Sequence, residues 1–166
     1  MTEKSVFACQ SLCRKLGFVA FAFSVLTLAS PGRVFAALGG DAASVQADQV
    51  HMQASLRSAR TTAYTVQELR SPAGVVVRQY VSPSGTVFGV AWEGPWLPDM
   101  RQLLGSYFEQ YEQAMQAQNS ARGGRRPIHI EIPGLIVHLS GHPRSFVGQA
   151  YVPDMVPAGM RAEEIR

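Results

Sequence analysis

Residues 64–92 read YTVQELR-SPAG-VVVRQYV-SPSG-TVFGVAW, and this stretch decides the fold. It contains the same kind of turn twice, as Ser71-Pro72-Ala73-Gly74 and as Ser82-Pro83-Ser84-Gly85. Proline at the second position of a turn presets φ, and glycine closes the turn without steric cost. The segments around the turns, Tyr64 to Arg70, Val75 to Val81 and Thr86 to Trp92, are rich in Val, Tyr, Phe and Thr. The sequence therefore predicts a three-stranded antiparallel meander.

The third of these segments has no face that suits water. Its residues alternate as Phe88, Val90 and Trp92 on one face and Val87, Gly89 and Ala91 on the other. We therefore expect both faces of this strand to be covered. The small side chains of the second face would let another part of the protein, or a partner, approach closely.

A second β pattern occupies the last third of the chain. Isoleucines alternate with polar residues from Ile128 to Ile132, the pair Pro133-Gly134 turns the chain, and alternation resumes from Leu135 to Leu139. A further turn at residues 140–143 precedes a final strand from Ser145 to Val152. This pattern predicts a second three-stranded meander.

Two helices are expected beside these strands. From Asp99 to Ala117 the apolar residues recur at intervals of three and four, which is typical of a long amphipathic helix. From Asp41 to Arg57 the chain lacks Pro and Gly and offers Asp41 or Ser44 as an N-cap, so it reads as a shorter helix or, alternatively, as a frayed arm. The predicted fold class is α+β, with two three-stranded antiparallel meanders, the long helix between them and the shorter helix at the N-terminus.

Residues 1–36 have the three zones of a secretory signal peptide. Basic residues, among them Arg14 and Lys15, precede an apolar run from Leu16 to Ala29, and small residues stand before the expected cleavage position between Ala36 and Ala37. The alternative is a permanent membrane anchor, but the apolar run is shorter than the roughly 20 residues that a membrane-spanning helix needs. We expect an exported protein, periplasmic in location, with no stable membrane anchor after cleavage.

Removing residues 1–36 changes what the composition implies. The chain of 166 residues has a formal net charge of +3, and the leader holds four basic residues and one acidic residue, which accounts for the whole excess. Residues 37–166 are then neutral, which argues against a nucleic-acid partner. Cys9 and Cys13 also lie in the leader, so the exported chain has neither a disulfide nor a thiolate nucleophile. Residues 37–166 suit a single domain.

The candidate chemistry lies in the first hairpin of the second meander. If Pro133-Gly134 closes a tight turn, counting back along both strands pairs His129 with His138 on one face. Glu131 shares that face, and His142 follows four residues after His138. Imidazoles and a carboxylate in this combination suit zinc or copper, and an adjacent imidazole pair also suits proton sensing. Alternatively, these are the polar positions of strands whose aliphatic residues face the core, and a slip of one residue in register would separate the histidines.

Catalysis by a nucleophile has little support in the sequence. The chain has no Gly-x-Ser-x-Gly motif, and the carboxylates Glu68, Glu93 and Asp99 are scattered without a pair that belongs to one cleft. The arginines between Asn119 and Pro127 lack the strand-to-helix context of a phosphate-binding loop, so a solvated loop is expected there. The sequence thus favours a non-enzymatic role over a catalytic one.

Several segments together point to a known family. They are Ala37-Leu38-Gly39-Gly40, Ser44-Val45-Gln46-Ala47-Asp48, residues 64–69, 80–88 and 90–95, Leu97-Pro98-Asp99 with Leu103-Leu104-Gly105, Arg144-Ser145-Phe146 and Tyr151-Val152-Pro153. With these segments the chain resembles the exported bacterial proteins called domain of unknown function 2844. The resemblance implies export, to the periplasm, and supplies no activity and no catalytic residues.

These observations favour a non-catalytic periplasmic module that binds or helps to assemble another envelope protein. The alternative is a metal-binding protein or metal-dependent hydrolase that uses His129, His138, His142 and Glu131 with zinc or copper.

Overall fold

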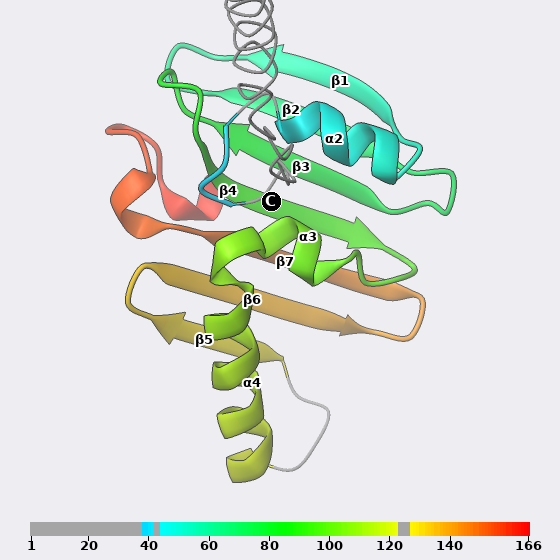
Figure 1. Ribbon diagram of the computed structural model, residues 1–166, viewed down its shortest axis with the longest axis vertical. Coiled ribbons are helices and arrows are strands. Elements are labelled where there is room, and N and C mark those ends of the chain that lie inside the picture. The colour runs from blue at the N-terminus through cyan, green and yellow to red at the C-terminus, as the bar shows by residue number, and fades with distance from the viewer. Residues whose placement is uncertain (1–37, 42–43, 123–126) are drawn as a thin grey trace, which may run out of the picture. The chain divides into compact units, whose positions relative to one another are not determined.

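The fold is known from a computed structural model that describes residues 38–41, 44–122 and 127–166. Within these residues the chain forms one antiparallel sheet of seven strands, with helices on one face and the C-terminal segment against the other (Figure 1). The strands are β1 (Ser55–Arg60), β2 (Thr65–Arg70), β3 (Val76–Val81), β4 (Val87–Gly94), β5 (Ile128–Ile132), β6 (Leu135–His142) and β7 (Ser145–Tyr151). The helices are α2 (Ser44–His51), α3 (Met100–Leu104) and α4 (Phe108–Arg122), with the 3-10 turns η1 (Gly105–Tyr107), η2 (Pro153–Met155) and η3 (Ala162–Glu164).

The strand order is β1-β2-β3-β4-β7-β6-β5. Both predicted runs of three antiparallel strands are present, as β2 to β4 and β5 to β7. The α+β class is confirmed, but the predicted arrangement of two three-stranded meanders is not matched exactly, because β1 adds a fourth strand to the first run and β4 pairs with β7, which joins the runs into one sheet. This pairing puts β4, which is apolar on both faces, at the centre of the sheet, where both of its edges are hydrogen-bonded.

The N-terminal helix is shorter than predicted. It ends at His51, and the chain turns at Gln53, which has a φ of 49°, before residues 55–60 form the edge strand β1 instead of helix. Pairing with β2 explains the difference, because it places Leu56 opposite Leu69 and hydrogen-bonds an edge that would otherwise be open. Tertiary pairing has therefore overridden the local helix propensity of this segment.

The long helix predicted from Asp99 to Ala117 is interrupted. Asp99 caps its first turn, since the backbone N–H of Gln102 donates to Oδ1 of Asp99 at 3.1 Å. The helix α3 then ends at Gly105, whose φ of 50° lies in the left-handed region, and η1 leads into α4. The break lets the chain change direction, so that α4 lies beside β5 in Figure 1.

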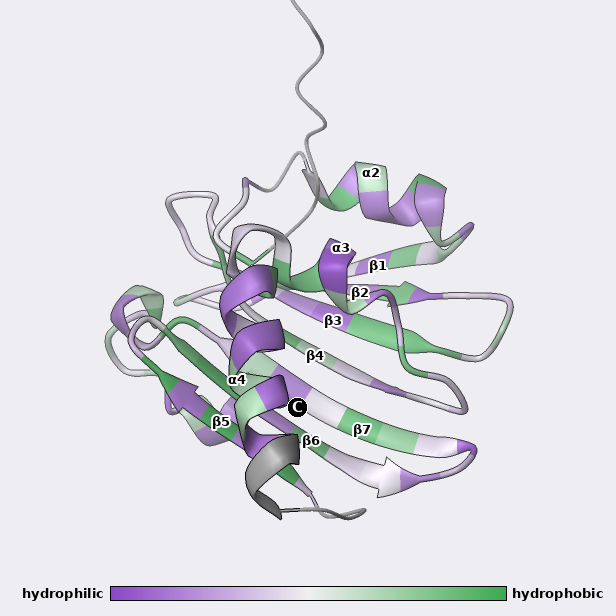
Figure 2. Ribbon diagram, turned by 60° about the horizontal axis from the view of Figure 1, so that its bottom comes forward, coloured by the Kyte–Doolittle hydropathy of each residue, from purple (hydrophilic) through white to green (hydrophobic). Residues whose placement is uncertain are grey.

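Each face of the sheet carries its own core cluster. The helix side holds Val77, Val90, Trp92, Leu103, Leu104 and Val137, among others, and the opposite side holds Tyr80, Phe88, Ala91, Tyr151, Met160 and Ile165. Figure 2 shows hydrophobic stretches along β3, β4 and β7 and a largely hydrophilic α4. The prediction that both faces of the third strand are covered is confirmed, and the chain's own C-terminal segment supplies the second cover.

A β-bulge reverses the expected position of Phe88. The register between β3 and β4 shifts so that Tyr80 lies opposite Gly89 but Val81 lies opposite Val87. The extra residue breaks the alternation, and Phe88 joins the cluster of Tyr80 while Val87 joins the helix-side cluster. The expected alternation holds only from Gly89 onwards.

The predicted leader, with its cleavage position at Ala36 and Ala37, lies outside the described residues, as does the centre of the arginine-bearing loop at 123–126. Across the part of the chain that the structure describes, no helix combines the length and the apolar character needed to span a membrane.

Candidate functional site

The hairpin of β5 and β6 places His129 directly opposite His138. Their ring centroids are 4.3 Å apart, and the ring planes are inclined by 30°. The predicted pairing is confirmed, and so is the turn on which it depends. In that turn Gly134 has a φ of 79°, a conformation that glycine adopts without strain.

The other two residues of the predicted site lie at different distances from this pair. Oε2 of Glu131 is 3.7 Å from Nε2 of His129, and both side chains are exposed, by 70% and 59%. His142 lies opposite Ser145 at the far end of β6, which at a rise of about 3.3 Å per residue is roughly 13 Å from His138. The structure thus brings Glu131 to the imidazole pair and leaves His142 apart. Considering only described residues, no three His, Cys, Asp or Glu side chains are grouped closely enough to hold a metal ion as they stand.

The surroundings of His138 favour the neutral form of its ring. Burial lowers the pKa of His138, and the neighbouring ring of His129 lowers it further. One ring nitrogen, Nδ1, lies 3.3 Å from the side-chain amide nitrogen of Gln149 in β7, whereas Nε2 is buried and has no hydrogen-bond partner among the described residues. A buried ring nitrogen without a partner is unusual and calls for an explanation.

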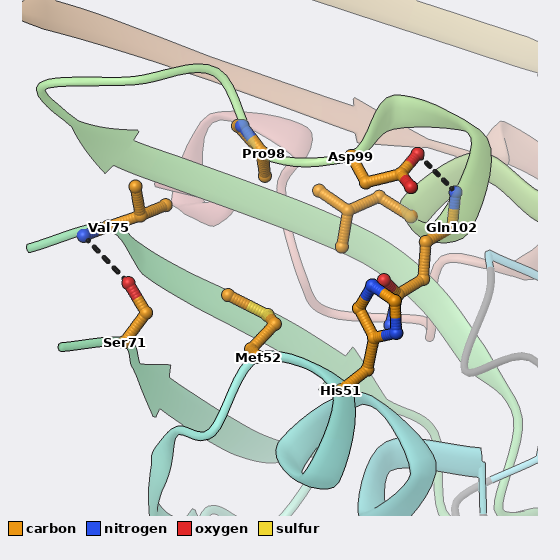
Figure 3. A pocket seen from close by; sticks show the side chains of 8 residues that line it. His51, Met52, Ser71, Val75, Pro98, Asp99 and Gln102 are labelled. Carbon is orange, nitrogen blue, oxygen red and sulfur yellow. Dashed lines mark hydrogen bonds between the residues drawn. The ribbon is translucent and has the colours of Figure 1, made fainter. Parts of the chain in front are cut away.

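A second candidate site is a pocket of about 190 Å³ between the end of α2, the turn from β2 to β3 and the start of α3 (Figure 3). Its lining residues are His51, Met52, Ser71, Val75, Pro98, Asp99, Gln102 and Leu103. Apolar side chains form the wall, while the imidazole of His51 and the carboxylate of Asp99 are exposed to solvent. The pocket therefore combines an apolar interior with a few polar groups, which is the usual composition of a binding site.

One wall of this pocket belongs to a buried polar cluster. Gln102 of α3 and Gln79 of β3 both donate from their side-chain amides to the carboxylate of Asp48, and the bond from Gln79 is 2.5 Å long. Asp48 and Gln79 have no exposed surface. Burial raises the pKa of Asp48 to about 6, although the two amide donors work in the opposite direction. The Oε1 atom of Gln79 is buried without a partner.

This cluster was not predicted, although the sequence places two polar residues, Asp48 and Gln79, at apolar positions of their patterns. Asp48 follows Val45 by three residues and precedes Met52 by four, so it stands on the apolar stripe of its own helix. Gln79 similarly lies between Val77 and Val81 on the inward face of β3. A charged or amide side chain at an apolar position of the pattern indicates a buried polar contact.

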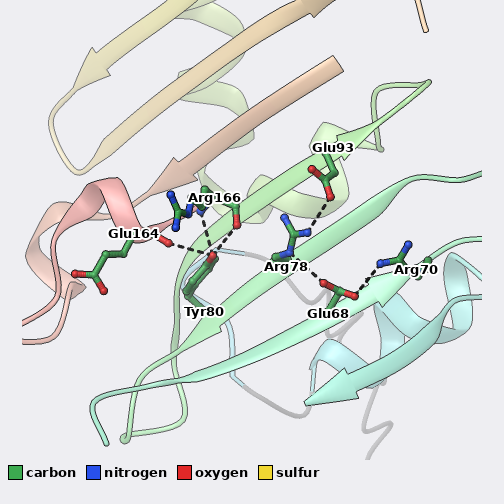
Figure 4. Close-up of polar contacts among 7 residues, drawn as sticks. All are labelled: Glu68, Arg70, Arg78, Tyr80, Glu93, Glu164 and Arg166. Carbon is green, nitrogen blue, oxygen red and sulfur yellow. Dashed lines mark hydrogen bonds and ion pairs between the residues drawn. The ribbon is translucent and has the colours of Figure 1, made fainter. Parts of the chain in front are cut away.

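The opposite face of the sheet carries a row of charges and the end of the chain (Figure 4). Glu68 accepts hydrogen bonds from Arg70 at 3.2 Å and from Arg78 at 3.1 Å, and Arg78 also bonds Glu93 at 2.8 Å. Further along β3, the hydroxyl of Tyr80 accepts from the backbone N–H of Arg166 at 3.0 Å. These contacts connect β2, β3 and β4 to one another and the C-terminal segment to β3.

A comparison with known protein families gives one match. The sequence model of the family described as "Protein of unknown function (DUF2844)" matches residues 34–165. The chain belongs to this family. The resemblance noted in the sequence is therefore confirmed over nearly all of the described domain. No curated protein and no solved structure matches the chain. The description of the DUF2844 family names no activity and no residue roles.

Proposed function

We propose that this DUF2844 protein is an exported, non-catalytic module that docks another envelope protein at the pocket between α2 and α3. The observation that carries the proposal is the size of that pocket. Pockets for small-molecule ligands usually enclose about 300–1,000 Å³, whereas this pocket encloses about 190 Å³. A space of this size accommodates one apolar side chain of a partner better than a whole metabolite.

The surroundings of the pocket support a protein partner. Trp96 and Leu97, which directly precede the lining residue Pro98, are 59% and 44% exposed. Val50, next to the lining residue His51, is 78% exposed. Exposed aromatic and aliphatic side chains are the usual anchors of a protein interface, and tryptophan is enriched among the residues that dominate binding energy.

Export is tested on the full chain expressed in a bacterium that secretes proteins. The expected result is protein in the periplasmic fraction whose mass corresponds to residues 37–166. Replacing the small residue at the cleavage position, in Ala36→Leu, should leave the leader attached and the protein with the membranes. Recovery of wild-type protein in the cytoplasm with residues 1–36 intact would refute export.

Docking is tested by crosslinked capture from the envelope of the native host. The double variant Trp96→Ala/Leu97→Ala should lose the captured partner, because it removes two exposed apolar side chains that precede the lining residue Pro98 without disturbing a buried residue. The matched control is Val147→Ala/Met155→Ala, which removes apolar side chains of similar exposure, 49% and 39%, away from the pocket. Equal capture by both double variants would overturn the proposed site.

The alternative function, a metal-dependent hydrolase, has one supporting observation, the contact between the rings of His129 and His138. The separation of His142 from this pair removes one of the four predicted ligands, and the remaining three, His129, His138 and Glu131, are not grouped around one point as they stand.

A further inference from the structure

Two imidazole rings lie side by side in a hollow of the sheet that is open to solvent. The hollow encloses about 340 Å³, and its lining includes His129, His138, Val147 and Gln149. Directly opposite residues on adjacent strands have the shortest distance between side chains in a sheet, so both rings can reach one point above the strands. The rings are held by the hairpin register and not by a mobile loop.

His138 has a ring nitrogen without a hydrogen-bond partner. Among the described residues its Nε2 atom is buried and unpartnered, whereas Nδ1 faces the side-chain amide nitrogen of Gln149 at 3.3 Å. Turning this carboxamide over brings its oxygen to Nδ1, which then carries the proton and leaves the lone pair on Nε2. The turned arrangement is the one found around metal-binding histidines, whose second nitrogen donates to a carbonyl or carboxylate.

Glu131 supplies a third group within reach. Its carboxylate is 3.7 Å from Nε2 of His129, and its side chain is 70% exposed, so it can rotate towards a cation without disturbing the core. The side chain of Arg166 lines the same hollow, and its positive charge opposes cation binding. We therefore expect moderate rather than very tight affinity.

We propose that His129 and His138 bind one late transition-metal cation, Cu²⁺ or Zn²⁺, through their ring nitrogens. Glu131 turns in as the third ligand, and water completes the coordination. Imidazole is a preferred ligand of these ions, whereas Mg²⁺ and Ca²⁺ require sites built mainly from oxygen atoms. Docking at the pocket between α2 and α3 involves other residues, so failure of either proposal leaves the other standing.

The test is a calorimetric titration of untagged protein recovered from cells that express the full chain. Cu²⁺ and Zn²⁺ are added separately, with Mg²⁺ as the control cation. We expect one equivalent of Cu²⁺ or Zn²⁺ to bind saturably and no heat from Mg²⁺. The electron paramagnetic resonance spectrum of the Cu²⁺ form should show coupling to two nitrogen ligands, a readout that a purely structural role of the histidines would not produce.

The four histidines of the chain provide matched variants. His129→Gln, at a half-exposed side chain, should weaken binding at least about tenfold without unfolding the protein, and Glu131→Gln should weaken it less. His142→Gln and His51→Gln should leave binding unchanged, because both rings lie outside the pair. Arg166→Gln should strengthen binding by removing a positive charge. Absence of saturable binding, or binding that His129→Gln and His142→Gln weaken equally, would overturn the proposal.

Discussion

The carboxylate of Asp48 in α2 accepts a hydrogen bond of 2.5 Å from the side-chain amide of Gln79 in β3, and neither side chain touches solvent. This contact connects the N-terminal helix α2 to β3 of the sheet, next to the central strand β4. A buried carboxylate with only amide partners is more easily protonated than one in water. Because the pKa of Asp48 is about 6 in the folded protein and 3.8 without burial, the folded state holds the proton more tightly than the unfolded chain.

The sign of the resulting pH dependence follows directly. Because the pKa of Asp48 is higher in the folded state, its ionised carboxylate lowers the free energy of unfolding. This loss of stability disappears as the pH falls from about 7 to about 4 and the carboxylate becomes protonated. A difference of roughly 2 pKa units corresponds to about 3 kcal/mol. Asp48→Asn should abolish this part of the pH dependence, since the introduced amide does not titrate and can donate to the unpartnered Oε1 of Gln79.

Urea unfolding of wild type and Asp48→Asn across this pH range measures the effect. The difference between the two proteins is the relevant quantity, because other groups titrate in both. Asp154→Asn is the matched control, as it changes an exposed carboxylate that is not among the charges acting on Asp48. Wild-type and Asp48→Asn curves that run parallel would show that the Asp48 carboxylate does not cause the dependence.

The ion pairs of Glu68 give a dependence of the opposite sign. Hydrogen bonds from Arg70 and then Arg78 lower the pKa of Glu68 despite partial burial, so its contribution is lost as the pH falls through that lowered value. Both contacts are near the surface, and we expect Glu68→Gln to cost about 0.5–1 kcal/mol, less in high salt. Arg70→Gln should cost less, because its side chain is 60% exposed and Glu68 keeps Arg78.

A double-mutant cycle on Glu68→Gln and Arg78→Gln, followed by thermal unfolding at low and high salt, measures this coupling. Additive effects in both salts would show that the pair does not contribute to stability.

The turn chemistry of the sequence was sufficient to predict most of the sheet. The first Ser-Pro-x-Gly turn and Pro133-Gly134 connect hairpins of regular register, and the opposition of His129 and His138 follows from counting residues. The second Ser-Pro-x-Gly turn precedes the bulge between β3 and β4, which turn chemistry did not predict. The strand β1 could not be found in this way, because the local pattern predicts helix as far as Arg57 and only pairing with β2 makes the segment extended. The junction of β4 with β7 likewise depends on contacts between distant segments.

The candidate metal site and the buried polar cluster differ in the same way, because the first lies within one hairpin and the second joins distant segments. Residues within one hairpin could be placed from local rules, so the relation of His129, His138 and Glu131 was accessible to sequence reasoning. The cluster of Asp48, Gln79 and Gln102 joins three elements far apart in the chain, and its position depends on how the helices lie on the sheet. Its local indications were the charge at Asp48 and the amide at Gln79, both at apolar positions of their patterns.

Gly148 in β7 is predicted to tolerate no side chain. A Cβ at this position would lie 2.4 Å from Cζ2 of Trp92 and 2.7 Å from the carbonyl oxygen of His138. Neither neighbour can yield, since the indole is buried and the oxygen belongs to the backbone of β6. We expect Gly148→Ala to destabilise the protein by about 1–3 kcal/mol and to change the fluorescence of Trp92.

The matched control is Gly89→Ala. Its Cβ would approach the flexible end of Ile165 at 2.9 Å, a contact that a small shift can relieve, so its cost should be smaller. Both variants are compared by chemical denaturation in a Trp96→Phe background, which leaves Trp92 as the reporting tryptophan. A stable Gly148→Ala protein with unchanged fluorescence would contradict the close packing described for β4 and β7.

The C-terminal segment is predicted to be held to the sheet chiefly by Ile165. Its side chain is fully buried over Gly89, in the cluster that contains Tyr80 and Tyr151. Ile165→Ala should therefore cost about 2–5 kcal/mol, the usual range for removing a buried isoleucine side chain.

Tyr80→Phe removes the hydroxyl that accepts from Arg166 and should cost about 1 kcal/mol. Hydrogen exchange distinguishes detachment of the segment from global unfolding, because detachment exposes the amides of residues 153–166 while those of β4 stay protected. If Ile165→Ala left exchange in the segment as slow as in wild type, the segment would be anchored by other residues, and the second core cluster would not depend on it.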